Sequence, residues 1–302
     1  MERSLPVAER PRRPEWMKVR APSADGRYFD VKQLVHGASL HTVCEEARCP
    51  NIGECWDQRT ATIMILGDTC TRACGFCAVK TGRPAAVDWD EPRRVAEAVQ
   101  RMQLNYVVLT SVNRDDLADG GAGIFAETLR VLRTQDPAIG VEYLTPDFQH
   151  KQGEAITIIG AALDVVTAAR AGQVRLVWGH NVETVPRLYR TARKGARYDT
   201  SLDLLRRTAE IPGVEAKSAL MLGLGETRDE VLEVLRDLRA AGVARVSLGQ
   251  YLRPSSDNLP VVEYIHPDRF AEYEHDARAL GFAWVKAGPL VRSSYHAEEE
   301  QT

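Results

Sequence analysis

The chain has 302 residues, 44% of them apolar and 27% charged, and a formal net charge of −3. This length suits one barrel-sized α/β unit, and the composition is that of an ordinary globular protein, which excludes a wholly disordered chain. The net charge gives no electrostatic case for nucleic acid or an anionic membrane as the main partner, because binding to either needs a concentrated positive surface, so we expect a neutral or protein-borne substrate. No apolar run has the length of a membrane span and the first residues lack a secretory apolar stretch, so we expect a cytoplasmic protein.

The first 30 residues are rich in Pro and Arg and show little periodicity. This pattern predicts an extended arm that either wraps a neighbouring part of the protein or stays a mobile tail. The first clear strand pattern follows much later, at residues 61–67. Three cysteines precede that strand, so we expect whatever they bind to lie outside the main sheet.

Beyond residue 67, apolar runs of strand length alternate with helical patterns. The predicted strands are 106–110, 141–144, 174–178, 216–222 and 245–248. The predicted helices are 91–102, 124–135 and 228–241, and several helical segments are predicted within 185–209. This alternation predicts about six parallel βα units, whose continuous apolar strands favour a full or partial barrel over an open sheet.

Two further stretches complete the pattern. Residues 149–173 fit one helix, two strands or one of each, and the sequence does not decide between them. Pro267 and Gly281 have the positions expected at the two ends of a helix over 267–280, and a short strand over 282–286 follows. The Glu-rich end of the chain is predicted to be a solvated terminus.

All six cysteines fall into two sets of three, and the spacing of the second set is the more specific signal of a metal site. Cys70, Cys74 and Cys77 form a C-x3-C-x2-C pattern directly after the strand predicted at 61–67. In a reducing compartment such thiols are metal ligands or catalytic groups, and three of them hold three irons of a cubane cluster while leaving the fourth iron open to a small molecule. The alternatives are a zinc site, which normally recruits a fourth ligand at short spacing, or free thiols. The loop also lies where barrel active sites are built, at the carboxyl end of a strand.

The first set, Cys44, Cys49 and Cys55, has the spacing C-x4-C-x5-C. It also supplies three thiolates with no fourth cysteine nearby. Two such sets in one chain predict two iron–sulfur clusters, and the alternative is a zinc-stapled N-terminal module.

The C-x3-C-x2-C loop resembles the cluster loop of the radical S-adenosylmethionine (SAM) superfamily. In that superfamily the open iron binds SAM, and reductive cleavage of SAM yields a radical that attacks unactivated C–H bonds. Together with the C-x4-C-x5-C motif, several segments from about Trp16 to Ala297 make the chain similar to the lipoyl synthases. These segments are LHTVCEEA, GDTCTRACGFCAVKTGRP, RDDLADGGA, HNVETVPRLY, KSALMLGLGET, QYLRPS and GPLVRSSYHA.

The resemblance implies a partial (β/α)6 TIM-type barrel of the radical SAM kind, with N- and C-terminal extensions covering the barrel mouth. It divides the chain into residues 1–60 with the auxiliary cysteines, the barrel over 61–286, and a tail over 287–302 with the RSSY motif. It further implies two [4Fe-4S] clusters, one binding SAM at Cys70, Cys74 and Cys77 and one auxiliary. The fourth ligand of the auxiliary cluster is expected to be Ser294, with Ser293 as the fallback. Without the resemblance, RSSY would be taken for an ordinary polar tail.

The implied reaction inserts sulfur at C6 and C8 of a protein-bound octanoyl-lysyl chain, with the auxiliary cluster as the sulfur donor. The implied partners are octanoylated lipoyl domains or the glycine cleavage H protein, an electron donor of the ferredoxin or flavodoxin type, and an iron–sulfur carrier protein. Neither nucleic acid nor a membrane is expected. The competing readings are another sulfur-inserting radical SAM enzyme, similar to biotin synthase or a methylthiotransferase, and a ferredoxin-like carrier or zinc module that binds no SAM.

Weaker candidates follow the predicted strands. Asn181 is expected to bind the cofactor, and Glu183, Glu226 and Arg253 are candidates for contact with SAM or the octanoyl-lysyl amide, although each is equally explained as a loop cap or an ion pair. We expect His180 to be a hydrogen-bonding loop residue. Turns are expected at Gly120, Gly121 and Pro254. The chain departs from the family in a longer stretch over 161–179 and in Ala219, where glycine is common.

Overall fold

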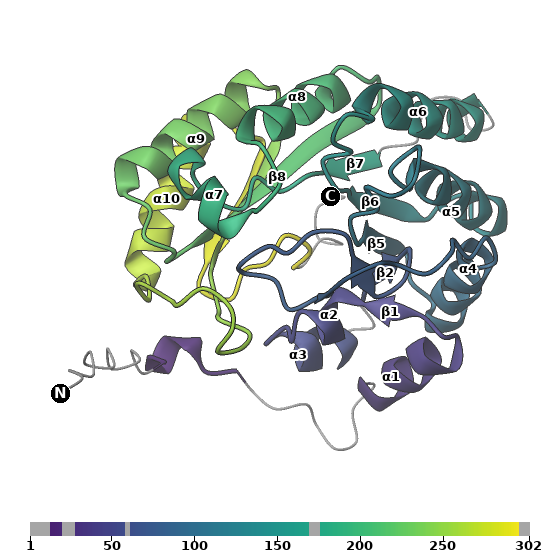
Figure 1. Cartoon of the computed structure of the whole chain (residues 1–302), viewed down its shortest axis with the longest axis horizontal. Helices are drawn as coiled ribbons and strands as arrows, with labels where there is room; N and C mark the ends of the chain where they lie inside the picture. Colours follow the sequence, from purple (N-terminus) through teal and green to yellow (C-terminus); the bar gives the residue numbers. More distant parts are fainter. Residues whose placement is uncertain (1–12, 20–27, 58–60, 169–175, 296–302) are drawn as a thin grey trace.

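The computed structural model describes residues 13–19, 28–57, 61–168 and 176–295. Its main sheet has the strand order β1-β2-β5-β6-β7-β8-β9-β10, curved around a central axis (Figure 1). The strands are β1 (His41–Thr42), β2 (Thr62–Ile65), β5 (Tyr106–Ser111), β6 (Gly140–Leu144), β7 (Leu176–Gly179), β8 (Val214–Leu222), β9 (Arg245–Gln250) and β10 (Trp284–Gly288). From β2 to β10 every neighbouring pair is parallel, whereas β1 is antiparallel to β2. Within the described residues β1 and β10 do not pair, so the predicted partial barrel is confirmed.

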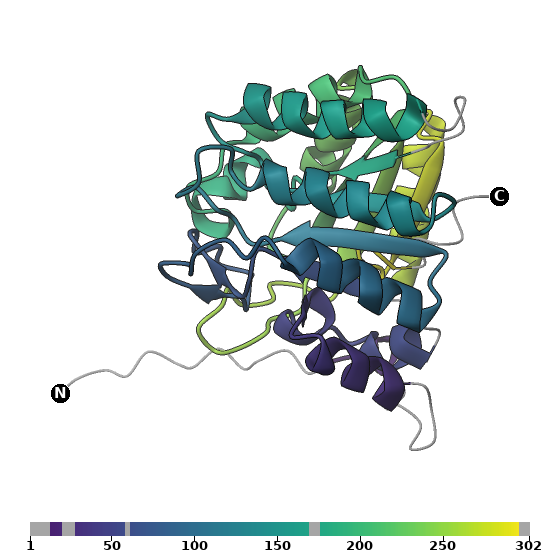
Figure 2. The same cartoon turned by 90° about the vertical axis from the view of Figure 1, so that its right-hand side faces the viewer.

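A helix follows each parallel strand from β2 to β9 and packs on the outside of the sheet. These helices are α4 (Glu91–Met102), α5 (Ala122–Gln135), α6 (Gln152–Ala168), α8 (Tyr198–Ala209), α9 (Arg228–Ala240) and α10 (Pro267–Ala279). Figure 2 shows α4, α5 and α6 side by side along one flank. In α4 the apolar residues Val95, Val99 and Met102 recur every three or four positions and are buried, which is the stripe that a helix needs on a sheet. The strands are buried on both faces, as parallel strands under helices must be.

The segment before β2 forms short elements, which are the 3-10 helix η1 (Glu15–Met17), α1 (Tyr28–Gly37), α2 (Val43–Glu46) and α3 (Ile52–Asp57). Of these, α2 contacts β1 and β2 at one edge of the sheet, and α1 contacts α3 and α4. Met17 is fully buried, and the ring of Trp16 meets that of His266 edge-on at 4.9 Å between centroids. Of the predicted arm, residues 13–19 therefore wrap the protein, while residues 1–12 and 20–27 lie outside the described part of the chain.

The stretch that the sequence left open, 149–173, is helical over α6, and its last residues lie outside the described part. The helical segments predicted over 185–209 are confirmed. They are the 3-10 helix η2 (Pro186–Leu188), α7 (Tyr189–Ala192) and α8, and Gly195, with a φ of +86°, lies in the turn that separates α7 from α8.

Smaller differences occur at the ends of strands. The strand predicted at 61–67 ends at Ile65, since Leu66 and Gly67 have φ values of 70° and 84° and turn the chain sharply. The first two residues of the strand predicted at 174–178 and the predicted terminus from residue 296 lie outside the described residues. No helix in the described part of the chain is long and apolar enough to cross a membrane.

Candidate iron–sulfur sites

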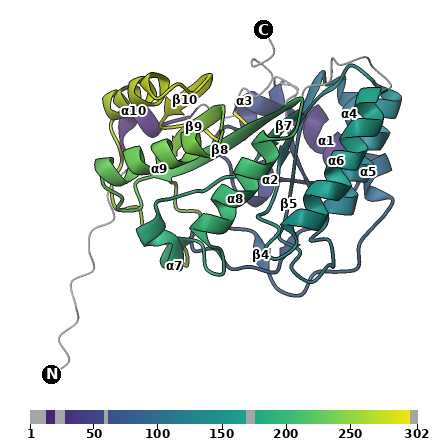
Figure 3. The same cartoon turned by 90° about the horizontal axis from the view of Figure 1, so that it is seen from above.

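The loop over residues 70–77, called the cluster loop below, follows β2 at the carboxyl end of the barrel strands. Two short parallel strands that the sequence did not predict, β3 (Thr69–Cys70) and β4 (Lys80–Thr81), flank it. In Figure 3, β4 and α7 lie at the same end of the barrel, and α3 lies toward the other end. The structure thus brings Cys70, Cys74 and Cys77 to the position that the sequence predicted for an active site.

Two of the three sulfur atoms of the cluster loop accept hydrogen bonds from backbone N–H groups. The N–H groups of Arg72 and Asn113 donate to Cys70 Sγ at 3.4 and 3.3 Å, and that of Val79 donates to Cys77 Sγ at 3.4 Å. Burial raises the pKa of Cys74 to about 12, and the negative charges of Cys77, Glu183 and Cys70 add to that rise. Three thiols of one loop whose charges act on one another, two of them beside N–H donors, fit a metal cluster, whose charge would hold them deprotonated and whose sulfur ligands such donors stabilise.

Among the described residues, no group of three or more His, Cys, Asp and Glu side chains converges as the ligands of a single metal ion do. A cubane cluster does not require such convergence, because each of its thiolate ligands binds a different iron atom.

Two segments that are distant in the chain clamp the cluster loop around Gly75. Its N–H donates to Ala192 O at 2.8 Å, and its carbonyl accepts from Leu259 N–H at 2.8 Å. The side-chain amide of Asn258 donates to Cys77 O at 2.8 Å. A Cβ at position 75 would lie 2.9 Å from Thr191 O, so only glycine fits between these neighbours. Sequence reasoning missed Gly75 and Asn258, because both clamps depend on loops that are distant in the chain.

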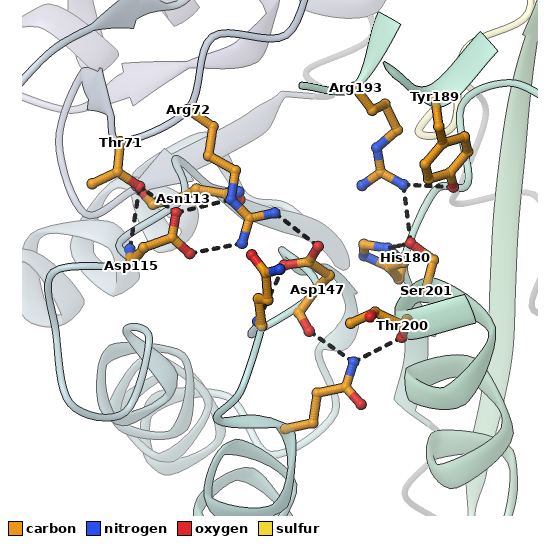
Figure 4. Close-up of polar contacts among 12 residues, drawn as sticks. Thr71, Arg72, Asn113, Asp115, Asp147, His180, Tyr189, Arg193, Thr200 and Ser201 are labelled. Carbon is orange, nitrogen blue, oxygen red and sulfur yellow. Dashed lines mark hydrogen bonds and ion pairs between the residues drawn. The ribbon is translucent and has the colours of Figure 1, made fainter. Parts of the chain in front are cut away.

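Arg72 ties the cluster loop to two neighbouring strands (Figure 4). Its guanidinium donates to both Asp115 carboxylate oxygens, at 2.8 and 2.7 Å, and to Asp147 Oδ2 at 2.7 Å. Asp115 follows β5 and Asp147 follows β6. Burial alone would raise the pKa of Asp147, but hydrogen bonding and the charge of Arg72 outweigh it and hold that pKa below its usual value. Both aspartates lie just beyond strand ends, which is the sequence signal that would have identified them.

A second part of the same network surrounds His180, which follows β7. Its ring nitrogens contact Thr145 O and Ser201 Oγ, both at 2.9 Å, so the expected hydrogen-bonding role is confirmed. Burial lowers the pKa of His180 to about 4, which leaves the ring neutral at pH 7. Arg193 donates to Ser201 Oγ at 3.0 Å and to Tyr189 Oη at 2.9 Å. Its positive charge opposes the rise that burial causes in the pKa of Cys74.

The candidate cofactor residues divide into two groups. Asn181 Nδ2 donates to Glu183 Oε1 at 3.1 Å, and the negative charge of Glu183 raises the pKa of both Cys74 and Cys77, after burial. Both side chains therefore lie near the cluster loop. By contrast, Glu226 accepts a hydrogen bond from Leu224 N–H at 3.0 Å. It therefore caps its own loop, which is one of the two alternatives to a contact with SAM or the substrate.

Arg253 likewise serves a loop. It donates to Asn258 O at 2.8 Å and so supports the residue that clamps the cluster loop. The expected turn at Gly120 and Gly121 is confirmed by their φ values of 65° and 93°.

The other three cysteines lie on α2, α3 and the turn between them. Burial raises the pKa of Cys44 to about 11, and a hydrogen bond from the backbone N–H of Thr62 opposes that rise. Cys49 N–H donates to Cys44 O at 3.0 Å, which holds the turn that returns the chain toward α3. The set belongs to the edge of the sheet and is distinct from the cluster loop.

The C-terminal segment over residues 288–295 runs from β10 to these cysteines. Leu290 O accepts from Asn51 Nδ2 at 2.7 Å, and Ser294 Oγ accepts from Thr62 Oγ1 at 2.8 Å. Tyr295 Oη donates to Glu54 Oε1 at 3.1 Å. Burial raises the pKa of Cys49, and the positive charge of Arg292 opposes it. The RSSY motif is thus packed against the first cysteine set and is no free polar tail.

Comparisons with known proteins agree with this geometry. A model of the radical SAM superfamily matches residues 64–238, and a model of the N-terminal domain of lipoyl synthase of that family matches residues 2–49. A lipoyl synthase from Rubrobacter xylanophilus is 52% identical over 289 residues, which are 95% of this chain and 86% of that protein. One from Methylococcus capsulatus is 54% identical over 301 residues, 98% of this chain and 90% of that protein.

Solved structures of similar shape have much lower sequence identity and bear on the fold alone. Streptococcus suis SuiB bound to the precursor peptide SuiA has a TM-score of 0.54 at 12% identity, covering 82% of this chain and 54% of that one. Methylornithine synthase PylB has a TM-score of 0.51 at 12% identity, covering 92% of this chain and 89% of that one.

Proposed function

The chain belongs to the lipoyl synthase family of radical SAM enzymes, and on that premise we propose that it inserts sulfur at C6 and C8 of a protein-bound octanoyl-lysyl chain. The observation that carries the proposal is the presence of two separate cysteine sets. One lies at the carboxyl ends of the strands, and the other lies against the C-terminal RSSY motif.

We assign the SAM-binding [4Fe-4S] cluster to Cys70, Cys74 and Cys77. When bound, this cluster and SAM supply a radical that removes hydrogen from an unactivated carbon. The protein's part is to fix the loop. The Arg72 guanidinium joins it to Asp115 and Asp147, and N–H donors stabilise its sulfur ligands. Asn181 and Glu183 face this loop and are assigned to SAM.

We assign the auxiliary cluster, the proposed sulfur source, to Cys44, Cys49, Cys55 and Ser294. The Ser294 hydroxyl receives a hydrogen bond from Thr62, whose backbone N–H also contacts Cys44, so the serine lies beside the thiols. A serine oxygen is a harder and weaker partner for iron than thiolate, which suits a cluster that must release sulfur. Ser293 stays the fallback.

The proposed partners are octanoylated lipoyl domains or the glycine cleavage H protein, a ferredoxin- or flavodoxin-type electron donor and an iron–sulfur carrier protein. A cytoplasmic setting and the division at residues 60 and 286 remain predictions from the sequence.

The direct test is mass spectrometry of an octanoyl-lysyl peptide after anaerobic incubation with the reconstituted protein, SAM and a strong reductant. Two added sulfur atoms per peptide are expected. SAM cleavage with an unmodified peptide would keep the radical chemistry and overturn the substrate.

A matched pair of triple variants separates the two cysteine sets. Replacing Cys70, Cys74 and Cys77 by Ala should abolish SAM cleavage, whereas replacing Cys44, Cys49 and Cys55 should leave cleavage and eliminate sulfur insertion. Sulfur insertion by the second variant would contradict the donor role. Tight SAM binding, measured by calorimetry, would also exclude a closed ferredoxin-like or zinc module.

A further inference from the structure

A short stretch beside the cluster loop carries an excess of positive charge. Residues 187–197 contain five basic residues and no acidic one. Arg187 is paired with Glu230, and Arg193 is buried against Tyr189 and Ser201. The other three, on α7 and the turn after it, are exposed and have no ion-pair partner among the described residues. We call Arg190, Lys194 and Arg197 the basic rim.

The basic rim is fixed to the outer side of the cluster loop. Ala192 O, within α7, accepts from Gly75 N–H at 2.8 Å. On the other side of the rim, a Cβ on Gly195 would lie 3.9 Å from Arg72 Cδ. Ala73, directly before Cys74, is exposed. A protein seated on the rim would therefore lie against the loop that carries Cys74, at the end of the barrel where Figure 3 shows α7 and β4.

Acidic residues near the loop do not cancel this charge. Asp115 is bound to Arg72, and Asp116 is bound to Arg114 at 2.9 Å. Asp68 accepts from Thr69 Oγ1. Asp199 is exposed and lies just after the rim. One carboxylate beside three basic side chains still leaves this surface with a net positive charge. This local excess stands out in a chain whose overall charge is −3, so composition alone does not produce it.

We propose that the basic rim is the docking surface for an acidic one-electron carrier protein. The inference rests on the proposed function, since a radical SAM site needs an electron from outside the chain. The reduced carrier would lose one electron, and the cluster that Cys70, Cys74 and Cys77 would hold would accept it, with no bond formed and no proton moved. Electron transfer weakens steeply with distance, so a carrier must dock over the cluster loop, which is where the rim lies. Opposite charges also speed the encounter and orient the partners.

The test compares two charge-reversed proteins. The rim variant carries Arg190→Glu, Lys194→Glu and Arg197→Glu. The control carries Lys32→Glu, Arg101→Glu and Arg236→Glu on α1, α4 and α9, which change the net charge equally. Arg101 and Arg236 are exposed, and Lys32 is partly exposed. Binding of an acidic flavodoxin is measured by calorimetry at low and high salt. Reduction by that flavodoxin is followed as growth of the cluster's electron paramagnetic resonance signal.

For the rim variant we expect binding and the reduction rate each to fall about tenfold or more at low salt, with a flatter salt dependence. Reduction by photoreduced deazaflavin, a small molecule, should stay at the wild-type rate, and the control protein should behave as wild type. Flavodoxin binding equal to wild type in the rim variant would overturn the proposal. Weaker binding of an octanoylated carrier domain with unchanged flavodoxin binding would assign the rim to the substrate and also overturn it.

A failure of the proposed function would give a different result from a failure of the rim proposal. Wild-type protein that binds flavodoxin but does not cleave SAM with deazaflavin would overturn the radical SAM assignment, while the calorimetric comparison would still report on the rim.

Discussion

Thr62 and Ser294 are 232 positions apart in the chain, yet their hydroxyl groups share a hydrogen bond of 2.8 Å. Thr62 begins β2, and its backbone N–H contacts the Cys44 sulfur. One residue thus holds the C-terminal serine beside the first cysteine set.

Ser294→Ala removes the proposed oxygen ligand, so we expect the variant to bind less iron at the auxiliary site and to lose most sulfur insertion, while SAM cleavage continues. Ser293→Ala is the matched control and should retain product. Iron analysis and mass spectrometry of the peptide product provide the comparison. The reverse pattern in the two variants would move the ligand to Ser293.

Arg72→Met leaves the carboxylate of Asp147, which is fully buried, without its partner. Loss of one partner from a buried ion pair costs about 3–5 kcal/mol, and we expect a decrease of that order in the free energy of unfolding of the cluster-free protein. Urea denaturation measures it. Arg93→Met, which removes exposed ion pairs on α4, should change stability very little, and equal losses in both variants would contradict the role given to Arg72.

Gly75→Ala introduces a Cβ 2.9 Å from Thr191 O and 3.0 Å from Leu259 Cγ. The cluster loop must then move away from α7, so we expect less iron at this site and weaker SAM binding. Calorimetry and iron content in a Cys44/Cys49/Cys55→Ala background isolate the effect. Gly37→Ala, where a Cβ meets nothing within 4 Å, should keep both at the parent level.

His180 predicts how stability depends on pH. Burial lowers its pKa in the folded protein to about 4, below the value near 6.5 of an unfolded histidine. Between these values the unfolded chain binds the extra proton, so stability falls as pH decreases from about 6.5 toward 4, by up to ~1.4 kcal/mol per pH unit from this group. The stability is fully present above that window.

His180→Gln should reduce this slope in urea denaturation series of the cluster-free protein. His275→Gln is the control, because His275 is exposed on α10. An unchanged slope in His180→Gln would show that other groups account for the acid sensitivity.

The sequence predicted the barrel well because its strands are buried on both sides. The runs at 106–110 and 141–144 fall within β5 and β6. Their apolar residues leave no other place for these segments than the centre of a sheet. The stretch at 149–173 stayed open because a helix that is apolar on most of its surface looks like strands in a sequence.

The cysteine ligands were recognisable from spacing, whereas their surroundings were not. The clamps on Gly75 come from Ala192 and Leu259, more than a hundred residues away, and no local pattern reports them. The turn at Gly195, which separates α7 from α8, also lies beside the cluster loop, because a Cβ there would be 3.9 Å from Arg72 Cδ, and no local pattern reports that contact. Contacts made by tertiary packing outweigh local preference at these positions.

The contact between residues 288–295 and the first cysteine set also fixes an order of events during synthesis. The chain is made from its N-terminus, so the three cysteines leave the ribosome more than two hundred residues before Ser294. The hydrogen bond between Thr62 and Ser294 therefore forms only after all the barrel strands have been made. A cluster that used Ser294 as a ligand would be completed after the barrel, and deleting residues 289–295 would remove this contact while the barrel strands remained.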